Sequence, residues 1–289
     1  MKQILQTIAY GSVYAIAYTL SLMPRAFLYA IASFLFFLAY YMIGYRKEVV
    51  IQNISRSFPD KQYGEIHCIV KKFYQCFTAY FAEIIKSISA PAEEFGTKII
   101  FENLELIDRH VNAGQNVFAC LGHCGNWEML NFMPYKLRHD MYAVYKPLRS
   151  GVMDRLMIKF RSRFGMKLIA DESVVRHILT QRSSPAVYLF PVDQRPKIHE
   201  DKYKFELLNQ ETYVLSGMEK LARRSRSAVI YLHITQQSKG NYKIRCRAIC
   251  SGSESLYEGE ITRKYVAMLT ENIREEPYGW LWTHQRWKR

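Results

Sequence analysis

His123 and Glu128 are the two residues of this sequence whose types and spacing are best suited to chemistry. They begin and end the hexapeptide His-Cys-Gly-Asn-Trp-Glu, which directly follows the apolar run 117–121. A carboxylate beside an imidazole fixes its tautomer and raises its basicity, so that the imidazole can take a proton from a hydroxyl group. The alternative is a structural histidine with a helix-capping glutamate. The hexapeptide alone leaves both interpretations open.

The elements around the hexapeptide decide whether its side chains can meet. The run 117–121 predicts a buried strand, and Gly122 and Gly125 permit a tight turn after it. Asn126 is a favourable helix N-cap, which places Glu128 in the first helical turn. In one continuous helix, positions five apart are rotated by roughly 140°, whereas a strand-end histidine and a first-turn glutamate can approach each other. We therefore expect a site at the end of a strand, where α/β folds bind ligands.

Apolar strand patterns and helical patterns alternate along most of the remaining chain. An amphipathic helix is predicted from Glu65 to Ala90, and Pro91 ends it. Strands are predicted at 117–121, 141–145, 186–192, 228–234 and 242–249, and helices at 104–112, 127–137, 151–164, 172–181, 213–225 and 257–275. This alternation predicts an α/β fold with a mixed, mostly parallel sheet flanked by helices.

The first 45 residues have the composition of a membrane anchor. Residues 26–45 carry no charge and are followed by Arg46 and Lys47. About twenty apolar residues cross a bilayer, and a basic flank favours a cytoplasmic position for the downstream domain. Residues 4–23 fit an interfacial helix or the first arm of a hairpin; a cleaved signal peptide or a buried core helix are the alternatives. We expect residues 1–45 to form an anchor of one or two apolar helices and 46–289 one catalytic domain.

The charge balance favours anionic partners. The chain has 40 basic and 26 acidic residues, a net charge of +14, which suits nucleic acid, an anionic membrane surface or a phosphorylated substrate. Basic residues gather at 136–167, 223–226, 239–247 and 286–289. The six cysteines form no Cys-x-x-Cys pair, so we expect reduced thiols and no metal site.

The hexapeptide His-x-Gly-Asn-Trp-Glu resembles the signature of the lysophospholipid acyltransferase superfamily, in the branch of the late acyltransferases of bacterial lipid A biosynthesis. The resemblance extends over most of the chain. It includes Pro24 before the apolar segment, Asn53 with Phe58-Pro59, Tyr145-Lys146-Pro147-Leu148, Arg161-x-Arg163-x-Gly165, Asp193-Gln194 and Pro277-x-x-Trp280-x-Trp282-x-His284-x-Arg286-Trp287-Lys288.

The chain departs from the family's pattern at two positions. The family's Phe-x-Gly element is Phe205-Glu206-Leu207-Leu208-Asn209 in this sequence, and Asn103 replaces a glycine at the start of a strand. Asparagine adopts the positive φ that glycine supplies, so we expect the turn to persist. Both changes bear on acyl-chain length and acceptor choice more than on the type of reaction.

The resemblance implies a catalytic pair, with His123 as general base and Glu128 as the partner of its imidazole. It also implies phosphate binding by Arg161, with Arg163 as the alternate, because a guanidinium binds anions in a bidentate manner. The alternative for each arginine is a solvated helix face. No cofactor and no metal are implied.

Further residues of the resembled motifs are candidate substrate-binding residues. Asp193 is expected to orient Arg161 or the substrate, unless it only forms a turn, and Gln194 to supply a hydrogen bond. Backbone N–H groups around Gly125, or a basic side chain, would stabilise an oxyanion. Asn126 and Lys146 are the remaining candidate substrate-binding residues. The terminal Trp280, Trp282 and Trp287 suit a belt at headgroup level or simple packing.

The resemblance implies an O-acyltransferase at the cytoplasmic face of a bacterial inner membrane. The donor would be acyl carrier protein, and the acceptor a hydroxyl group of a phosphorylated lipid A precursor. Three alternatives remain: an acyltransferase that uses acyl-CoA on another glycolipid or aminolipid, a membrane-anchored hydrolase, and a basic nucleic-acid-binding protein. The sequence contains no recognised nucleic-acid-binding fold, so we expect no nucleic acid as partner.

Overall fold

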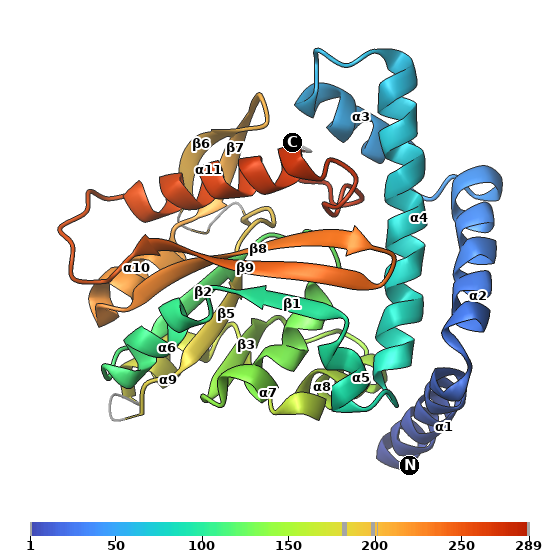
Figure 1. Ribbon diagram of the computed structural model, residues 1–289, viewed down its shortest axis with the longest axis horizontal. Coiled ribbons are helices and arrows are strands. Elements are labelled where there is room, and N and C mark those ends of the chain that lie inside the picture. Colours follow the sequence, from blue (N-terminus) through green and yellow to red (C-terminus); the bar gives the residue numbers. More distant parts are fainter. Residues whose placement is uncertain (1, 181–183, 198–199, 201, 288–289) are drawn as a thin grey trace.

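A seven-stranded mixed sheet forms the centre of the computed structural model, which describes residues 2–180, 184–197, 200 and 202–287 (Figure 1). The strand order is β1-β9-β8-β2-β5-β3-β4. Only β8 and β9 pair in antiparallel fashion within this sheet; the other described pairs are parallel. The strands are β1 (Ile99–Glu102), β2 (Val117–Leu121), β3 (Met141–Tyr145), β4 (Lys167–Ala170), β5 (Val187–Pro191), β8 (Ala228–Ser238) and β9 (Asn241–Cys250). The predicted α/β fold with a mostly parallel sheet is confirmed.

Helices cover both faces of this sheet, so its central strand β2 is buried at every position. Val117, Ala119 and Leu121 pack on the face covered by α5 (Ala92–Gly96), α6 (Glu105–Asn112) and α7 (Met133–Leu137). Phe118 and Cys120 pack on the opposite face, with α9 (Val174–Thr180), α10 (Gly217–Ser225) and α11 (Glu260–Glu275). Burial on both faces explains why β2 reads as a continuous apolar run rather than an alternating one.

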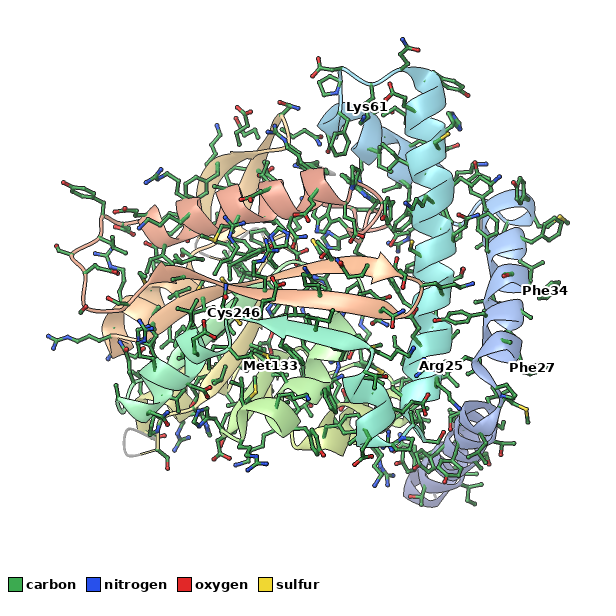
Figure 2. All side chains as sticks on the ribbon, in the orientation of Figure 1. Arg25, Phe27, Phe34, Lys61, Met133 and Cys246 are labelled. Atoms are coloured by element: carbon green, nitrogen blue, oxygen red, sulfur yellow. The ribbon has the colours of Figure 1, made fainter. Side chains whose placement is uncertain are left out.

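The N-terminal helices lie beside one edge of the sheet (Figure 1). They are α1 (Lys2–Leu22), α2 (Arg25–Phe37), α3 (Lys47–Ser57) and α4 (Tyr63–Ser87), and a π-helical turn, Leu38–Met42, continues α2. By length and composition, Arg25–Met42 is apolar enough to cross a membrane. Phe27 and Phe34 project from the side of α2 that faces away from α4, with 50% and 60% of their surface exposed (Figure 2).

Several element boundaries differ from the predicted ones. The segment 127–137 begins as a 3-10 helix, Trp127–Phe132, and 151–164 is α8 (Gly151–Arg161) followed by the 3-10 turn Ser162–Phe164. The short edge strands β1 and β4 were not predicted, since four residues carry little periodicity. Within the predicted helix 172–181, position 181 lies outside the described residues.

The predicted helix 213–225 is wrong at its start. Residues 213–215 belong to β7 (Gln210–Leu215), which pairs with β6 (Lys202–Leu207) in a separate antiparallel hairpin. Its two-residue loop has φ values of 52° at Leu208 and 61° at Asn209, as a type I′ turn requires. Asn103 likewise has a φ of 62°. The asparagines therefore adopt the positive φ expected of them.

Candidate active site

His123 meets Asp193 because their strands are neighbours. His123 follows β2 and Asp193 follows β5, and these parallel strands pair in register from Val117 with Val187 to Leu121 with Pro191. Their carboxyl ends therefore lie at the same edge of the sheet. The imidazole Nδ1 donates to Asp193 Oδ1 over 2.6 Å, and the backbone N–H of His123 donates to Oδ2 over 2.8 Å. Two residues 70 positions apart thus form one hydrogen-bonded unit.

Asp193 is fixed by a third hydrogen bond from the C-terminal segment. The indole Nε1 of Trp280 donates to Asp193 Oδ2 over 2.7 Å, and only 4% of Asp193 is exposed. Burial alone would raise the pKa of this carboxyl. The charge of His123 and the hydrogen bonds from His123 and Trp280 outweigh burial and lower the pKa to about 2. Asp193 is therefore an ionised, immobile partner for the imidazole.

The second nitrogen of His123 faces the open side of the site. Gln194 Nε2 donates to His123 Nε2 over 3.3 Å, which fits the tautomer that carries its proton on Nδ1. The imidazole packs edge-on against Trp127, with ring centroids 4.7 Å apart. Burial lowers the pKa of His123, but the charge and hydrogen bond of Asp193 more than compensate and raise it above the ordinary histidine value. This histidine is a strengthened base, and the lone pair on its Nε2 accepts from Gln194.

Glu128 pairs with Arg161 instead of with His123. Arg161 Nε donates to Glu128 Oε2 over 3.0 Å, and its Nη2 donates to Oε1. Asn131 Nδ2 donates to Oε2 over 3.0 Å. These contacts correct two expectations, because Asp193 takes the imidazole contact predicted for Glu128, and Glu128 takes the contact with Arg161 predicted for Asp193. Asp193 reaches Nδ1 from the adjacent strand, which the spacing within the hexapeptide does not reveal.

Arg161 retains a partly open guanidinium despite this pairing. Its side chain is 23% exposed, whereas that of Glu128 is 6% exposed. The bidentate bond with Glu128 raises the pKa of Arg161 against the effect of burial. Arg163 lies apart from this pair, since it donates to the backbone carbonyl of Ser87 and stacks on Phe164. Of the two arginines, Arg161 is the one that belongs to the site.

The structure gives no direct contact with His123 or Arg161 for the side chains of the remaining candidates, Gly125, Asn126 and Lys146. The N–H of Gly125 donates to Gly279 O over 2.9 Å, so it is not a free oxyanion donor. Gly125 has a φ of 55°, and an added Cβ would lie 3.0 Å from Ile234 Cγ2. Asn126 occupies the N-cap position without a capping hydrogen bond. Lys146 lies on the exposed segment after β3.

Glu83 is a residue of this site that sequence reasoning did not select. It lies in α4, is 3% exposed, and accepts hydrogen bonds from Asn126 Nδ2 at 2.9 Å, Tyr242 Oη at 2.7 Å and Tyr29 Oη at 3.2 Å. Burial raises the pKa of Glu83 although these hydrogen bonds lower it. The one available signal was its position off the apolar stripe of a long helix. Glu83 connects the hexapeptide to α2 and β9.

The C-terminal tryptophans pack rather than form a headgroup belt. Trp280 and Trp282 are 2% and 0% exposed, and Trp287 is half-buried with its ring 5.7 Å from that of Trp280. Arg286 donates to the carbonyl of Tyr213, and burial lowers its pKa to about 10. Lys288 and Arg289 lie outside the described residues. The C-terminal segment therefore packs against the site, where Trp280 contacts Asp193 and Gly279 contacts Gly125.

The arrangement joins a base to an anion-binding cation. His123 with Asp193 can take a proton from a hydroxyl group, and Arg161 can bind a phosphate. Cys124 is 3% exposed and burial raises its thiol pKa well above the usual value, which makes it an inert packing residue. Within the described part of the chain, no group of three or more histidine, cysteine or acidic side chains has the arrangement of a metal site.

Comparison with known proteins agrees with this chemistry. The chain matches the family described as bacterial lipid A biosynthesis acyltransferase over residues 2–289. No curated protein matches it. Because the family match covers nearly every residue, the chain belongs to the bacterial lipid A biosynthesis acyltransferase family.

Proposed function

We propose that the protein transfers a fatty acyl chain from acyl carrier protein to a hydroxyl group of a phosphorylated lipid A precursor. The hydrogen-bonded unit of His123 and Asp193, with Arg161 beside it, is the observation that carries this proposal. The unit supplies a base for the hydroxyl group, and the guanidinium supplies a contact for the acceptor's phosphate. The family membership supports the reaction type.

In the proposed step, Nε2 of neutral His123 takes the proton of the acceptor hydroxyl group. The hydroxyl oxygen forms a bond with the thioester carbonyl carbon and produces a tetrahedral oxyanion. The carbon–sulfur bond then breaks, and the leaving thiolate takes the proton back from His123. Asp193 stabilises the imidazolium in between, as the carboxylate does in other base-and-carboxylate pairs. No covalent acyl-enzyme is required.

Gln194 is the proposed donor to the oxyanion. The backbone N–H groups of His123 and Gly125 already donate to Asp193 and Gly279, which favours a side-chain donor. The Gln194 amide lies 3.3 Å from the reactive nitrogen of His123. When the acceptor hydroxyl group takes that place, the amide can donate to the carbonyl oxygen next to it.

We further propose that the N-terminal helices hold the protein on the cytoplasmic face of a bacterial inner membrane. Apolar side chains remain exposed along α1, α2 and the π-helical turn that continues α2, including Leu5, Ile16, Phe27, Phe34 and Met42. The net charge of +14 suits both an anionic lipid surface and an acidic carrier protein.

The direct test is mass spectrometry of a reaction that contains the purified protein, acyl carrier protein thioesters and a lipid A precursor, with His123→Ala protein in parallel. A gain of one acyl chain on the lipid, absent with the variant, would support the proposal. An intact thioester without lipid product would redirect the search to acyl-CoA and other acceptors. Thioester loss without lipid product would favour a hydrolase.

A further inference from the structure

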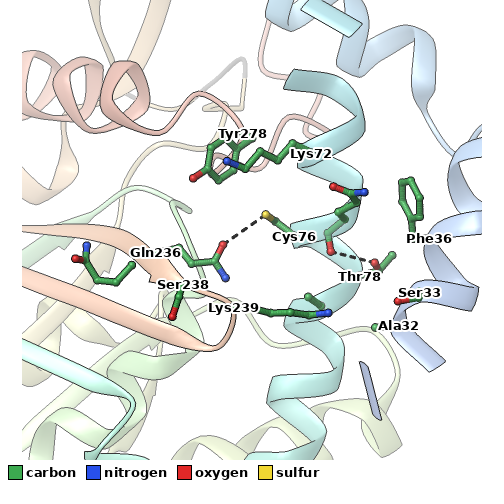
Figure 3. Close-up of a pocket in the computed structure, with 13 residues that line it drawn as sticks. Ala32, Ser33, Phe36, Lys72, Cys76, Thr78, Gln236, Ser238, Lys239 and Tyr278 are labelled. Atoms are coloured by element: carbon green, nitrogen blue, oxygen red, sulfur yellow. Dashed lines mark hydrogen bonds between the residues drawn. The ribbon is translucent and has the colours of Figure 1, made fainter. Parts of the chain in front are cut away.

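A pocket of about 490 Å³ lies between α2, α4 and the tip of the β8–β9 hairpin (Figure 3). Ala32, Ser33 and Phe36 of α2 form its outer wall, and α4 and the hairpin form the inner one. Gly240 at the hairpin tip has a φ of 74° and an added Cβ would collide with Tyr29 Oη. The hairpin and α2 therefore meet closely beside the pocket.

The lining of this pocket is cationic and rich in neutral polar groups. Lys72 of α4 and Lys239 of the hairpin both line it, with Nζ atoms 3.6 Å and 4.2 Å from the ring centroids of Tyr278 and Tyr29. Among the described residues, neither lysine forms an ion pair with a carboxylate. Amide and hydroxyl groups of Gln75, Thr78, Gln236, Gln237 and Ser238 complete the polar lining. Because neither lysine is in a direct ion pair and the other polar groups of the lining are neutral, the pocket favours an anion.

A carboxylate near the pocket is already satisfied. Glu276 accepts two hydrogen bonds of 3.0 Å from the backbone N–H of Gln236 and one of 3.0 Å from Tyr278 Oη. It is 7% exposed and is not part of the lining. Burial raises the pKa of Glu276 and the charge of Lys72 partly offsets this, but neither Lys72 nor Lys239 makes a direct ion pair with this carboxylate.

The position of the pocket indicates a lipid as the source of the anion. Its outer wall is α2, and the side of α2 that faces away from α4 exposes Phe27 and Phe34 (Figure 2). Tyr278 of the lining directly precedes Gly279, which accepts from Gly125, and Trp280, which donates to Asp193. An anion held here would lie directly behind the helix that exposes these apolar side chains.

We propose that Lys72 and Lys239, from different sides of this pocket, bind the phosphorylated headgroup of a lipid (Figure 3). Lysine is a compact point charge that commonly binds phosphate, and lysines near an anionic lipid surface strengthen binding. The further assignment of this lipid as the acceptor rests on the proposed function, with Arg161 as the second phosphate contact nearer the base.

Lysine labelling by an amine-reactive ester, read by mass spectrometry, tests the pocket without any acyl transfer. The probes are dihexanoyl phosphatidic acid, dihexanoyl phosphatidylcholine and inorganic phosphate, added to the detergent-solubilised full chain and to His123→Ala protein. Lys204, in an exposed ion pair with Glu211, is the reference. We expect phosphatidic acid to protect Lys72 and Lys239 but not Lys204 in both proteins. Equal protection by inorganic phosphate, protection of Lys204, or no protection would overturn the proposal.

Steady-state kinetics test the assignment of the lipid as acceptor. The Lys72→Gln/Lys239→Gln variant should raise KM for the lipid A precursor by about 30-fold, since each lysine near an anionic headgroup contributes roughly a fivefold change. Its kcat should stay within about twofold, as should both constants of Lys204→Gln. Unchanged KM in the double variant, with protection intact, would overturn the assignment to the acceptor. Absence of acyl transfer by the unmodified protein would instead count against the proposed function.

Discussion

Two ion pairs lie in the active site, and they differ in how completely the protein encloses them. In the pair of His123 and Asp193, the carboxylate is 4% exposed and accepts three hydrogen bonds, two from His123 and one from Trp280. In the pair of Arg161 and Glu128, the arginine side chain is 23% exposed. The first pair is immobile, whereas the second presents its cation to the solvent.

This difference indicates a division of labour between the two carboxylates. Asp193 holds the imidazole in one tautomer and orientation, which is the requirement for a base. Glu128 positions Arg161 without neutralising all its donors, because a guanidinium has five N–H groups and Glu128 uses two of them. An arginine anchored in this way can bind a phosphate at little cost in side-chain entropy.

Removing the base should have the largest effect. We expect His123→Ala to lower kcat/KM for acyl transfer by about 10⁴-fold, since the variant lacks the nitrogen that takes the proton of the hydroxyl group. Thermal unfolding should show that the variant still folds. His139→Ala, which removes the histidine of the more exposed pair with Asp108, should keep full activity. Equal losses in both variants would mean that folding, rather than base catalysis, was affected.

Asp193→Asn should lower the plateau rate by about 10³-fold and shift the pH profile. Asp193 raises the pKa of His123, and only neutral His123 accepts a proton, so activity falls as the pH drops through that raised pKa. Loss of the carboxylate lowers this pKa, and the acidic limb of kcat/KM should move to lower pH. Asp108→Asn is the matched control. An acidic limb that stays in place would show that Asp193 does not act through the imidazole.

Arg161→Lys should mainly weaken acceptor binding. Lysine keeps the charge but cannot make the bidentate contact, so we expect KM for the lipid A precursor to rise about 10- to 100-fold, with a smaller change in kcat. Arg163→Lys is the natural comparison, because Arg163 binds the carbonyl of Ser87 instead, and its KM should change by less than about threefold. A larger rise in KM for Arg163→Lys than for Arg161→Lys would assign phosphate binding to Arg163 instead.

Glu83→Gln should have the smallest effect on catalysis and a measurable one on stability. An amide in place of this carboxylate presents an N–H group to donors from Asn126, Tyr242 and Tyr29, so we expect the free energy of unfolding to fall by about 1–3 kcal/mol. Turnover should fall only a few-fold, through Asn126. Urea unfolding measures this, with Glu94→Gln of the half-buried pair with Arg25 as control. Unaltered stability would remove Glu83 from the framework of the site.

Strand-end positions were predictable where the apolar pattern was strong. The limits of β2 and β3 agree with the predicted 117–121 and 141–145, since buried strands leave a continuous apolar run. The hairpin of β6 and β7 was mispredicted because its β7 strand, Gln210–Leu215, runs almost directly into α10 and only Ser216 separates them. Asn103 and Asn209 could be read as positive-φ positions, because few residues other than glycine adopt that conformation.

The sequence by itself determined the chemical groups of the site: a histidine directly after a buried strand, a glutamate in the next turn, an arginine in the basic segment and an aspartate after a second strand. Only the tertiary structure decided their pairing. The parallel pairing of β2 with β5 brings His123 to Asp193, and the 3-10 helix from Trp127 carries Glu128 to Arg161. Spacing along the chain shows only which residues are near in sequence. The carboxylate that contacts the His123 imidazole comes from the neighbouring strand, and the register of the two strands decides which residue that is.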